Sequence, residues 1–353
     1  MDRLRIIILG ILVSAIPLVA QAPRPAQVDA GWAALEKGDG NRAAAIFEQA
    51  LASSPQDPLL LFGAGAAAFL QGRYADAREK LTLAFSLNPR LISAPEMLGE
   101  IDYLQGDLEG AIQRYEQALP YAAHLAPSMQ KRLEAWRKEA GVHRKLSGAS
   151  TGRFSIVFDG GSNNALATHA IGVLDRAFQR IADQLGADPP GRIQVILYTE
   201  RQFRDITHGP EWATGVFDGK IRIPTQGAAQ DWERFDQVLT HELGHAMIAG
   251  VAPQGVPGWL HEGLADYFES EDVGQALARA QARGVMIPLA QLEEGFGRLS
   301  AAQALAAYDQ SLVAAEMLAR TVGPRCPDRA PPDQSLVRPP SYAQRSSACS
   351  VAP

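Results

Sequence analysis

The pattern of hydrophobic and polar positions divides the chain into a helical half and a mixed half. Between residues 28 and 126, small and apolar residues return with a period of 34 residues. The matching sets are Gly38, Gly72 and Gly106; Ala43, Ala77 and Ala111; Phe47, Leu81 and Tyr115; and Ala50, Ala84 and Ala118. Each period predicts a helix pair with a glycine at its turn and small residues where helices touch. Because one pair cannot bury its apolar face alone, three copies in register predict a stacked array.

The period and its residues resemble the tetratricopeptide repeat. That resemblance implies a concave groove for a peptide or partner protein, although a rigid spacer or a support for the next domain fits the pattern equally well. After the array, residues 127–150 are expected to form a capping helix and a linker. Apolar residues from Met129 to His143 recur at helical spacing and predict the cap. The run from Ser147 to Gly152 predicts the linker.

The second half begins as a mixed α/β region. Alternating residues from Phe154 to Phe158 predict a strand, and residues 164–185 have the period of an amphipathic helix. The continuous apolar run from Ile193 to Tyr198 predicts a buried strand. Asp218-Gly219 between strand-like residues predicts a hairpin. The predicted fold class is therefore multi-domain, with an all-α repeat array followed by an α+β domain over residues 151–322.

The first residues have the pattern of a secretory signal peptide. Arg3 and Arg5 precede an apolar run that extends to Ala20. We expect residues 1–22 to be removed, by cleavage after Ala22 or after Ala20, and an uncleaved membrane anchor is the alternative. The sequence therefore predicts an exported protein, periplasmic or extracellular, with no stable membrane span once the signal is cleaved.

Charge and cysteine content add two limits. A net charge of −6, from 33 Lys+Arg and 39 Asp+Glu, argues against a nucleic-acid partner. Two cysteines are too few for a disulfide scaffold. Both of them, Cys326 and Cys349, lie in residues 323–353, whose Pro, Ser and Arg content predicts a disordered tail. In an exported protein they could be bonded or free.

The candidate chemistry lies in two predicted helices. His241 and His245 are four residues apart, so both imidazoles project from one side of a helix and can bind one metal ion. Glu242 lies beside them and can act on a metal-bound water. On the second predicted helix, Glu262 can supply a third ligand. Asp266, one turn later, can accept the free ring N–H of a ligand histidine and fix its tautomer.

Residues 154–322 resemble the gluzincins, and more narrowly the bacterial peptidase MA-like family, through the two helices just described and the stretch Trp259-Leu260-His261-Glu262-Gly263-Leu264-Ala265. The resemblance implies a zincin-like metallopeptidase domain with one Zn²⁺ per chain. It implies His241, His245 and Glu262 as the zinc ligands, Glu242 as the general base and Asp266 as the orienting carboxylate.

Other residues near these helices have weaker signals. The oxyanion of peptide hydrolysis needs a second stabiliser, and Tyr308, in a predicted helix over 301–320, and His208, before the hairpin, are candidates, although each is more often structural. His261 and Glu269 are expected to be exposed. Gly244 inside the first helix predicts that another segment approaches closely there.

These observations predict an exported zinc metallopeptidase that acts on a peptide or protein substrate, with repeats that recruit substrate or a partner protein. Two alternatives stay open. One is a repeat scaffold that binds a partner and carries a metallopeptidase-like domain without activity. The other is a metal-dependent hydrolase that cleaves a different kind of bond.

Overall fold

The computed structural model describes residues 26–121, 127–160, 164–189, 191–208, 213–252, 255–269, 272–284, 286–293, 295–296 and 299–322. The predicted signal peptide, the predicted tail, Cys326 and Cys349 lie outside these residues. Within them, no helix is both long and apolar enough to span a membrane.

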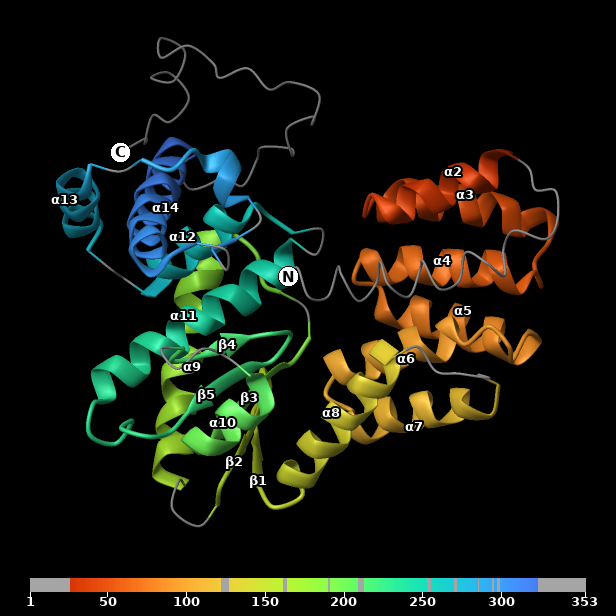
Figure 1. Ribbon diagram of the computed structural model, residues 1–353, viewed down its shortest axis with the longest axis horizontal. Coiled ribbons are helices and arrows are strands. Elements are labelled where there is room, and N and C mark those ends of the chain that lie inside the picture. The colour runs from red at the N-terminus through yellow and green to blue at the C-terminus, as the bar shows by residue number, and fades with distance from the viewer. Residues whose placement is uncertain are drawn as a thin grey trace, which may run out of the picture.

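The first part of the structure is a stack of paired helices, as the period predicts (Figure 1). The pairs are α2 (Ala26–Glu36) with α3 (Gly40–Ser53), α4 (Pro58–Leu70) with α5 (Tyr74–Leu87), and α6 (Ser93–Leu104) with α7 (Leu108–Ala118). The periodic glycines lie between the helices of each pair with φ of 74° at Gly38, 72° at Gly72 and 87° at Gly106. These left-handed conformations end each first helix sharply, which explains why glycine recurs there. The periodic alanines at 43, 77 and 111 are all fully buried.

Helix α8 (Pro127–His143) follows the array, as predicted, and packs against α7. The predicted linker after it is wrong, because Ser147–Ser150 forms strand β1 and pairs antiparallel with β2 (Phe154–Phe158). Serine, glycine and alanine have little intrinsic preference for a strand. Hydrogen bonding along the open edge of β2 outweighs that local preference.

The second part contains a small mixed sheet of order β1-β2-β3-β5-β4. Its inner strands β2, β3 (Ile193–Tyr198) and β5 (Ile221–Pro224) are parallel, and the two outer strands are antiparallel to their neighbours. The strand and helix predictions over 154–198 are confirmed, with α9 (Asn164–Leu185) connecting β2 to β3. The predicted hairpin is also present, as β4 (Val216–Phe217) and β5, with a φ of 99° at Gly219 in its turn.

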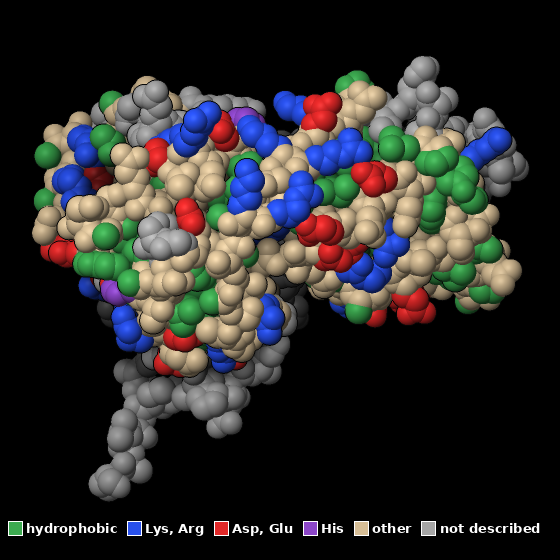
Figure 2. Space-filling view, turned by 90° about the horizontal axis from the view of Figure 1, so that it is seen from below, with side chains coloured by type: hydrophobic (Ala, Val, Ile, Leu, Met, Phe, Trp, Pro, Cys, Tyr) green, Lys and Arg blue, Asp and Glu red, His purple; other side chains and the backbone are tan. Residues whose placement is uncertain are grey.

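Helices form the rest of the second part (Figure 1). They are α10 (Glu200–Thr207), α11 (Trp232–Val251), α12 (Gly258–Glu269), α13 (Val273–Arg283) and α14 (Ala301–Val322), with a short 3₁₀ turn at Leu289–Leu292. Another 3₁₀ turn, Leu119–Tyr121, follows α7 in the first part. Helix α11 packs on α9 and α12, and α12 packs on α14. Figure 2 shows the helical part and the sheet-containing part in direct contact at a waist. The described chain is therefore a helical repeat region joined to a mixed α and β region.

Candidate metal centre

Three side chains with metal-binding atoms converge between α11 and α12. His241 and His245 are on α11, and their Nε2 atoms lie 3.1 Å apart. Glu262 comes from α12, with its Oε2 atom 3.5 Å from Nε2 of His245 and 3.9 Å from Nε2 of His241. The structure thus brings together the three residues that the sequence indicated as ligands.

A glycine makes this approach of the two helices possible. A Cβ atom placed on Gly244 would lie 3.2 Å from Cα of Ala265 and 3.2 Å from the ring of Phe268. These atoms belong to α12, so a larger residue at Gly244 would push α12 away from α11. The close approach expected at Gly244 is therefore present, and it positions Glu262 beside the histidines.

Two carboxylates face the far nitrogen of His241. Nδ1 of His241 lies 3.1 Å from Oδ1 of Asp266 and 3.3 Å from Oε2 of Glu269. Burial lowers the pKa of His241, but hydrogen bonds with Asp266 and then Glu269 outweigh it and raise the pKa overall. These contacts place a proton on Nδ1 and leave Nε2 directed at Glu262. The expectation that Glu269 is a solvated charge is wrong, because its side chain is only 17% exposed.

His261 also differs from its expectation. It is half-buried, and its Nδ1 atom lies 2.8 Å from Nδ1 of His245. The rings are nearly parallel, with 8° between their planes. Burial lowers the pKa of His245, and His241 and His261 lower it further, so His245 is held neutral. Helical spacing showed that His261 leaves the helix away from Glu262, but it could not show that α11 lies on that side.

Glu242 is buried with one oxygen unpaired. Its side chain lines a pocket beside α11, and among the described residues Oε2 has no hydrogen-bond partner. Burial is the largest cause that raises its pKa, to about 7, with Glu262 adding to it. Gly215 lies against the other side of the carboxylate, where a Cβ atom would be 2.7 Å from Oε1.

The two oxyanion candidates have different positions. Tyr308 is on α14, lines the same pocket as His241 and Glu242, and its hydroxyl donates a hydrogen bond to Glu262. Burial and the nearby Glu262 raise the pKa of its phenol, so it stays protonated. His208 is exposed and ends α10 in a left-handed conformation, with φ of 50°. The structure does not bring His208 into the pocket, because this residue lies exposed at the end of α10. Helix α10 is not among the elements predicted from the sequence. The Thr199–Gln202 capping box at its start was the available signal.

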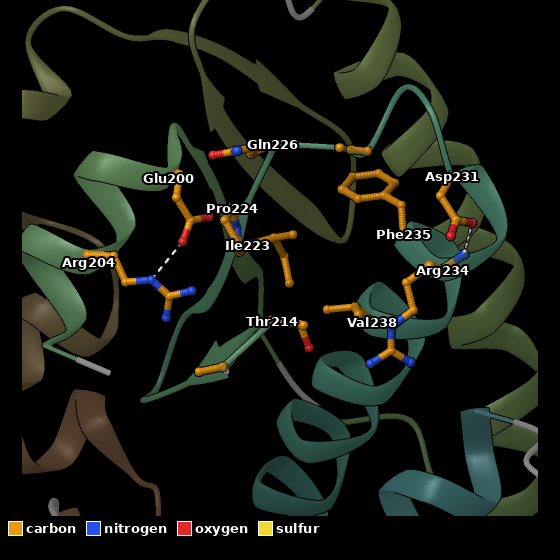
Figure 3. A pocket seen from close by; sticks show the side chains of 13 residues that line it. Glu200, Arg204, Thr214, Ile223, Pro224, Gln226, Asp231, Arg234, Phe235 and Val238 are labelled. Atoms are coloured by element: carbon orange, nitrogen blue, oxygen red, sulfur yellow. Dashed lines mark hydrogen bonds and ion pairs between the residues drawn. The ribbon is translucent and has the colours of Figure 1, made fainter. Parts of the chain in front are cut away.

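The pocket over Glu242 has a volume of about 690 Å³ and includes charged residues that the sequence analysis did not identify. Arg279 and Arg283 from α13 both donate to Asp309 on α14, and Arg234 on α11 lies near Glu269. A second pocket, between α10, β5 and the start of α11, adjoins it (Figure 3). Both pockets include Thr214 and Val238 in their walls, so they lie side by side, and together we call them the cleft.

The donor set at this site fits zinc. A tetrahedral zinc ion with bonds of about 2.0–2.2 Å holds its ligand atoms about 3.3–3.6 Å apart. The three donor atoms of His241, His245 and Glu262 are separated by 3.1, 3.5 and 3.9 Å. Two imidazole nitrogens and one carboxylate oxygen also match the ligand chemistry of catalytic zinc sites.

Comparisons with known proteins support the repeats. A family model described as tetratricopeptide repeat matches residues 28–89. Among solved structures, the Sgt2 TPR domain from Aspergillus fumigatus matches at 24% identity, covering 37% of this chain and 92% of that chain, with a TM-score of 0.32. No curated protein matches the chain. The chain therefore contains tetratricopeptide repeats, while the resemblance of residues 154–322 to gluzincins stays a prediction.

Proposed function

We propose that the protein is a zinc-dependent metallopeptidase. The observation that carries the proposal is the convergence of His241, His245 and Glu262 within 4.8 Å of one another, next to the buried carboxylate of Glu242. A buried acid with an unpaired oxygen is costly to keep in a fold. A role in moving a proton explains why it lies here.

The residues of the site have separate tasks in this proposal. A bound zinc ion would lower the pKa of a coordinated water and polarise the scissile carbonyl. Glu242 accepts a proton at its free Oε2 and returns it to the leaving amine. Asp266 and Glu269 hold the proton of His241 on Nδ1. Tyr308 lines the pocket, and its phenolic O–H, which donates to Glu262 in this structure, can turn to donate to the developing oxyanion.

The cleft has room for a peptide substrate. One of its pockets includes His241 and Glu242, and the second, which shares Thr214 and Val238 with it, includes Ile223, Pro224 and Phe235 in its wall (Figure 3). An extended chain lying along the cleft would pass over Glu242. We further propose that the protein acts after export, in the periplasm or outside the cell, as the predicted signal peptide implies.

A scaffold without catalytic activity is the second candidate. It is favoured by the family match, which covers residues 28–89 and not the metal centre. Tetratricopeptide repeats are commonly used for protein–protein interaction, so in this case the repeats would bind a partner protein and the second part would serve only as a folded support.

Metal analysis combined with a cleavage assay separates the two candidates. We expect the purified protein to hold one zinc ion per chain and to cleave labelled casein, and we expect His245→Ala to lose both properties. Arg137→Gln, at an exposed position of α8, is the control. A histidine outside the site, His143, is not used as a control because it contacts Tyr198. Absence of stoichiometric zinc in the wild-type protein would refute the enzyme proposal. Zinc without cleavage of any unfolded protein would favour the scaffold.

A further inference from the structure

The two parts of the molecule meet at a buried cluster around Arg222 of β5. Arg222 is 1% exposed, and its guanidinium donates to four groups. These are Glu139 on α8 at 3.0 Å, the hydroxyl of Tyr198 on β3 at 2.9 Å, Asp218 in the hairpin turn at 3.0 Å, and the hydroxyl of Tyr103 on α6. One side chain thus joins the last repeat, the capping helix and two segments of the sheet region.

Charge within this cluster is balanced. The buried Glu139 also accepts a hydrogen bond from Tyr103, at 2.8 Å, and lies 3.8 Å from Nζ of Lys220. Burial alone would raise the pKa of Glu139, but Arg222 and then Lys220 outweigh it and lower the pKa to about 2. Removal of either partner would leave an uncompensated buried charge, which is strongly destabilising.

Helix α8 belongs to both parts. On one side, Trp136 stacks on Tyr103 of the last repeat, with 5.0 Å between ring centroids. On the other side, His143 lies 2.8 Å from the Tyr198 hydroxyl, and Val142 packs beside β3 residues. The helix expected only to cap the array is therefore also the joint that fixes the array to the sheet.

The strand that carries Arg222 continues into the wall of the cleft. Arg222 pairs with Val216 of β4. Gly215, the residue before Val216, lies against the Glu242 carboxylate. The residue after Arg222, Ile223, lines the second pocket (Figure 3). A shift of this hairpin would change both the space above Glu242 and the shape of the pocket beside it.

We propose that Arg222 is a positioning residue for the cleft, which holds the β4–β5 hairpin in place by binding it to the repeat array through Glu139 and Tyr103. The proposal rests on the proposed function for its effect on substrate. The repeats then serve as a fixed support of the cleft, and not as a flexible recruiting arm. Arg222 touches none of the metal-binding atoms, so it acts on substrate binding and not on the metal.

Calorimetry and steady-state kinetics with labelled casein test this proposal. Tyr103→Phe removes the hydroxyl at the junction and keeps the ring that stacks on Trp136. Arg222→Lys keeps the positive charge and removes the planar guanidinium group. Arg137→Gln, at an exposed position of α8, is the matched control. We expect wild type and Arg137→Gln to unfold in one transition, and the two junction variants to unfold in two. We also expect Arg222→Lys to raise KM roughly tenfold while zinc content stays equal and kcat changes little.

Several results would overturn the inference. Two separate transitions in the wild-type protein would show that the array is not fixed to the sheet. Unchanged KM in both folded junction variants, or equal loss of kcat and zinc, would show that Arg222 does not position the cleft. If wild type binds zinc but cleaves no casein, the proposed function fails, and the calorimetric comparison still decides whether the junction couples the two parts.

Discussion

The repeat array and the candidate metal centre use buried side chains for opposite purposes. In the array, alanines and large apolar residues at a fixed period fill the space between helices, and burial stabilises the fold. At the metal centre, Glu242, His245 and Asp266 are buried although each is polar. Such groups cost stability unless they are paired. We therefore expect substitutions at the periodic core positions of the array to change stability and not chemistry, and substitutions at the centre to do the reverse.

The largest expected effect is the loss of activity in Glu242→Gln. The amide cannot accept the proton, so kcat should fall by about a thousandfold or more. Stability should stay equal or rise, because a buried unpaired carboxylate is replaced by a neutral group. Casein cleavage, zinc analysis and thermal unfolding measure the three quantities, with Glu233→Gln at an exposed position of the same helix as the control. Normal turnover by Glu242→Gln would mean that another group is the base.

The reverse behaviour is expected in the array for Leu81→Ala. Leu81 is fully buried and packs against Gly65 of α4. Truncation should lower the free energy of unfolding by about 2–5 kcal/mol, from lost burial and the cavity that remains. Leu83→Ala, at a position 42% exposed on the same helix, should cost far less. Denaturant titration compares the two variants, and equal losses would contradict the packing assigned to the periodic position.

Helix α6 of the array carries buried carboxyl groups, and Glu96 is one of them. Burial and then the nearby Glu100 raise its pKa from 4.5 to about 7. Because the folded pKa is raised, its stabilising contribution is complete below pH 4.5 and is lost as pH rises through about 7. That loss is about 3 kcal/mol. Glu96→Gln should remove this pH dependence and be more stable than wild type at pH 8.

Denaturant titrations of wild type and Glu96→Gln between pH 5 and pH 8 measure that difference. Exposed Glu109→Gln on α7 is the matched control and should follow wild type at every pH. Since both proteins contain the same candidate metal centre, its pH dependence cancels in the comparison. Parallel curves for wild type and Glu96→Gln would show that Glu96 ionises normally in the fold.

Sequence reasoning worked best where local spacing decides the structure. The period of the array, the strands at 154–158 and 193–198, and the shared face of His241 and His245 all follow from helix and strand geometry within short segments. Prediction from the sequence failed where a segment distant in the chain determines the environment of a residue. His261 and Glu269 were expected in solvent because nothing local shows which helices cover them. Ser147–Ser150 was expected to be a linker because only the edge of β2 makes it a strand.

The same limit explains why the sequence alone could not decide whether Tyr308 or His208 is the oxyanion donor. The smallest effect that we predict, a change of kcat in Tyr308→Phe, tests which of the two it is. The α14 helix directs Tyr308 into the pocket and onto Glu262, whereas His208 lies exposed at the end of α10. Tyr308→Phe should lower kcat for casein by about a hundredfold through loss of one oxyanion donor, with zinc still bound. His208→Ala should cleave at the wild-type rate. Since Tyr308 also donates to Glu262, zinc content must be measured in the same samples. A fall in kcat that matches a loss of zinc would assign Tyr308 to holding the ligand, and a slow variant with full zinc would assign it to the oxyanion.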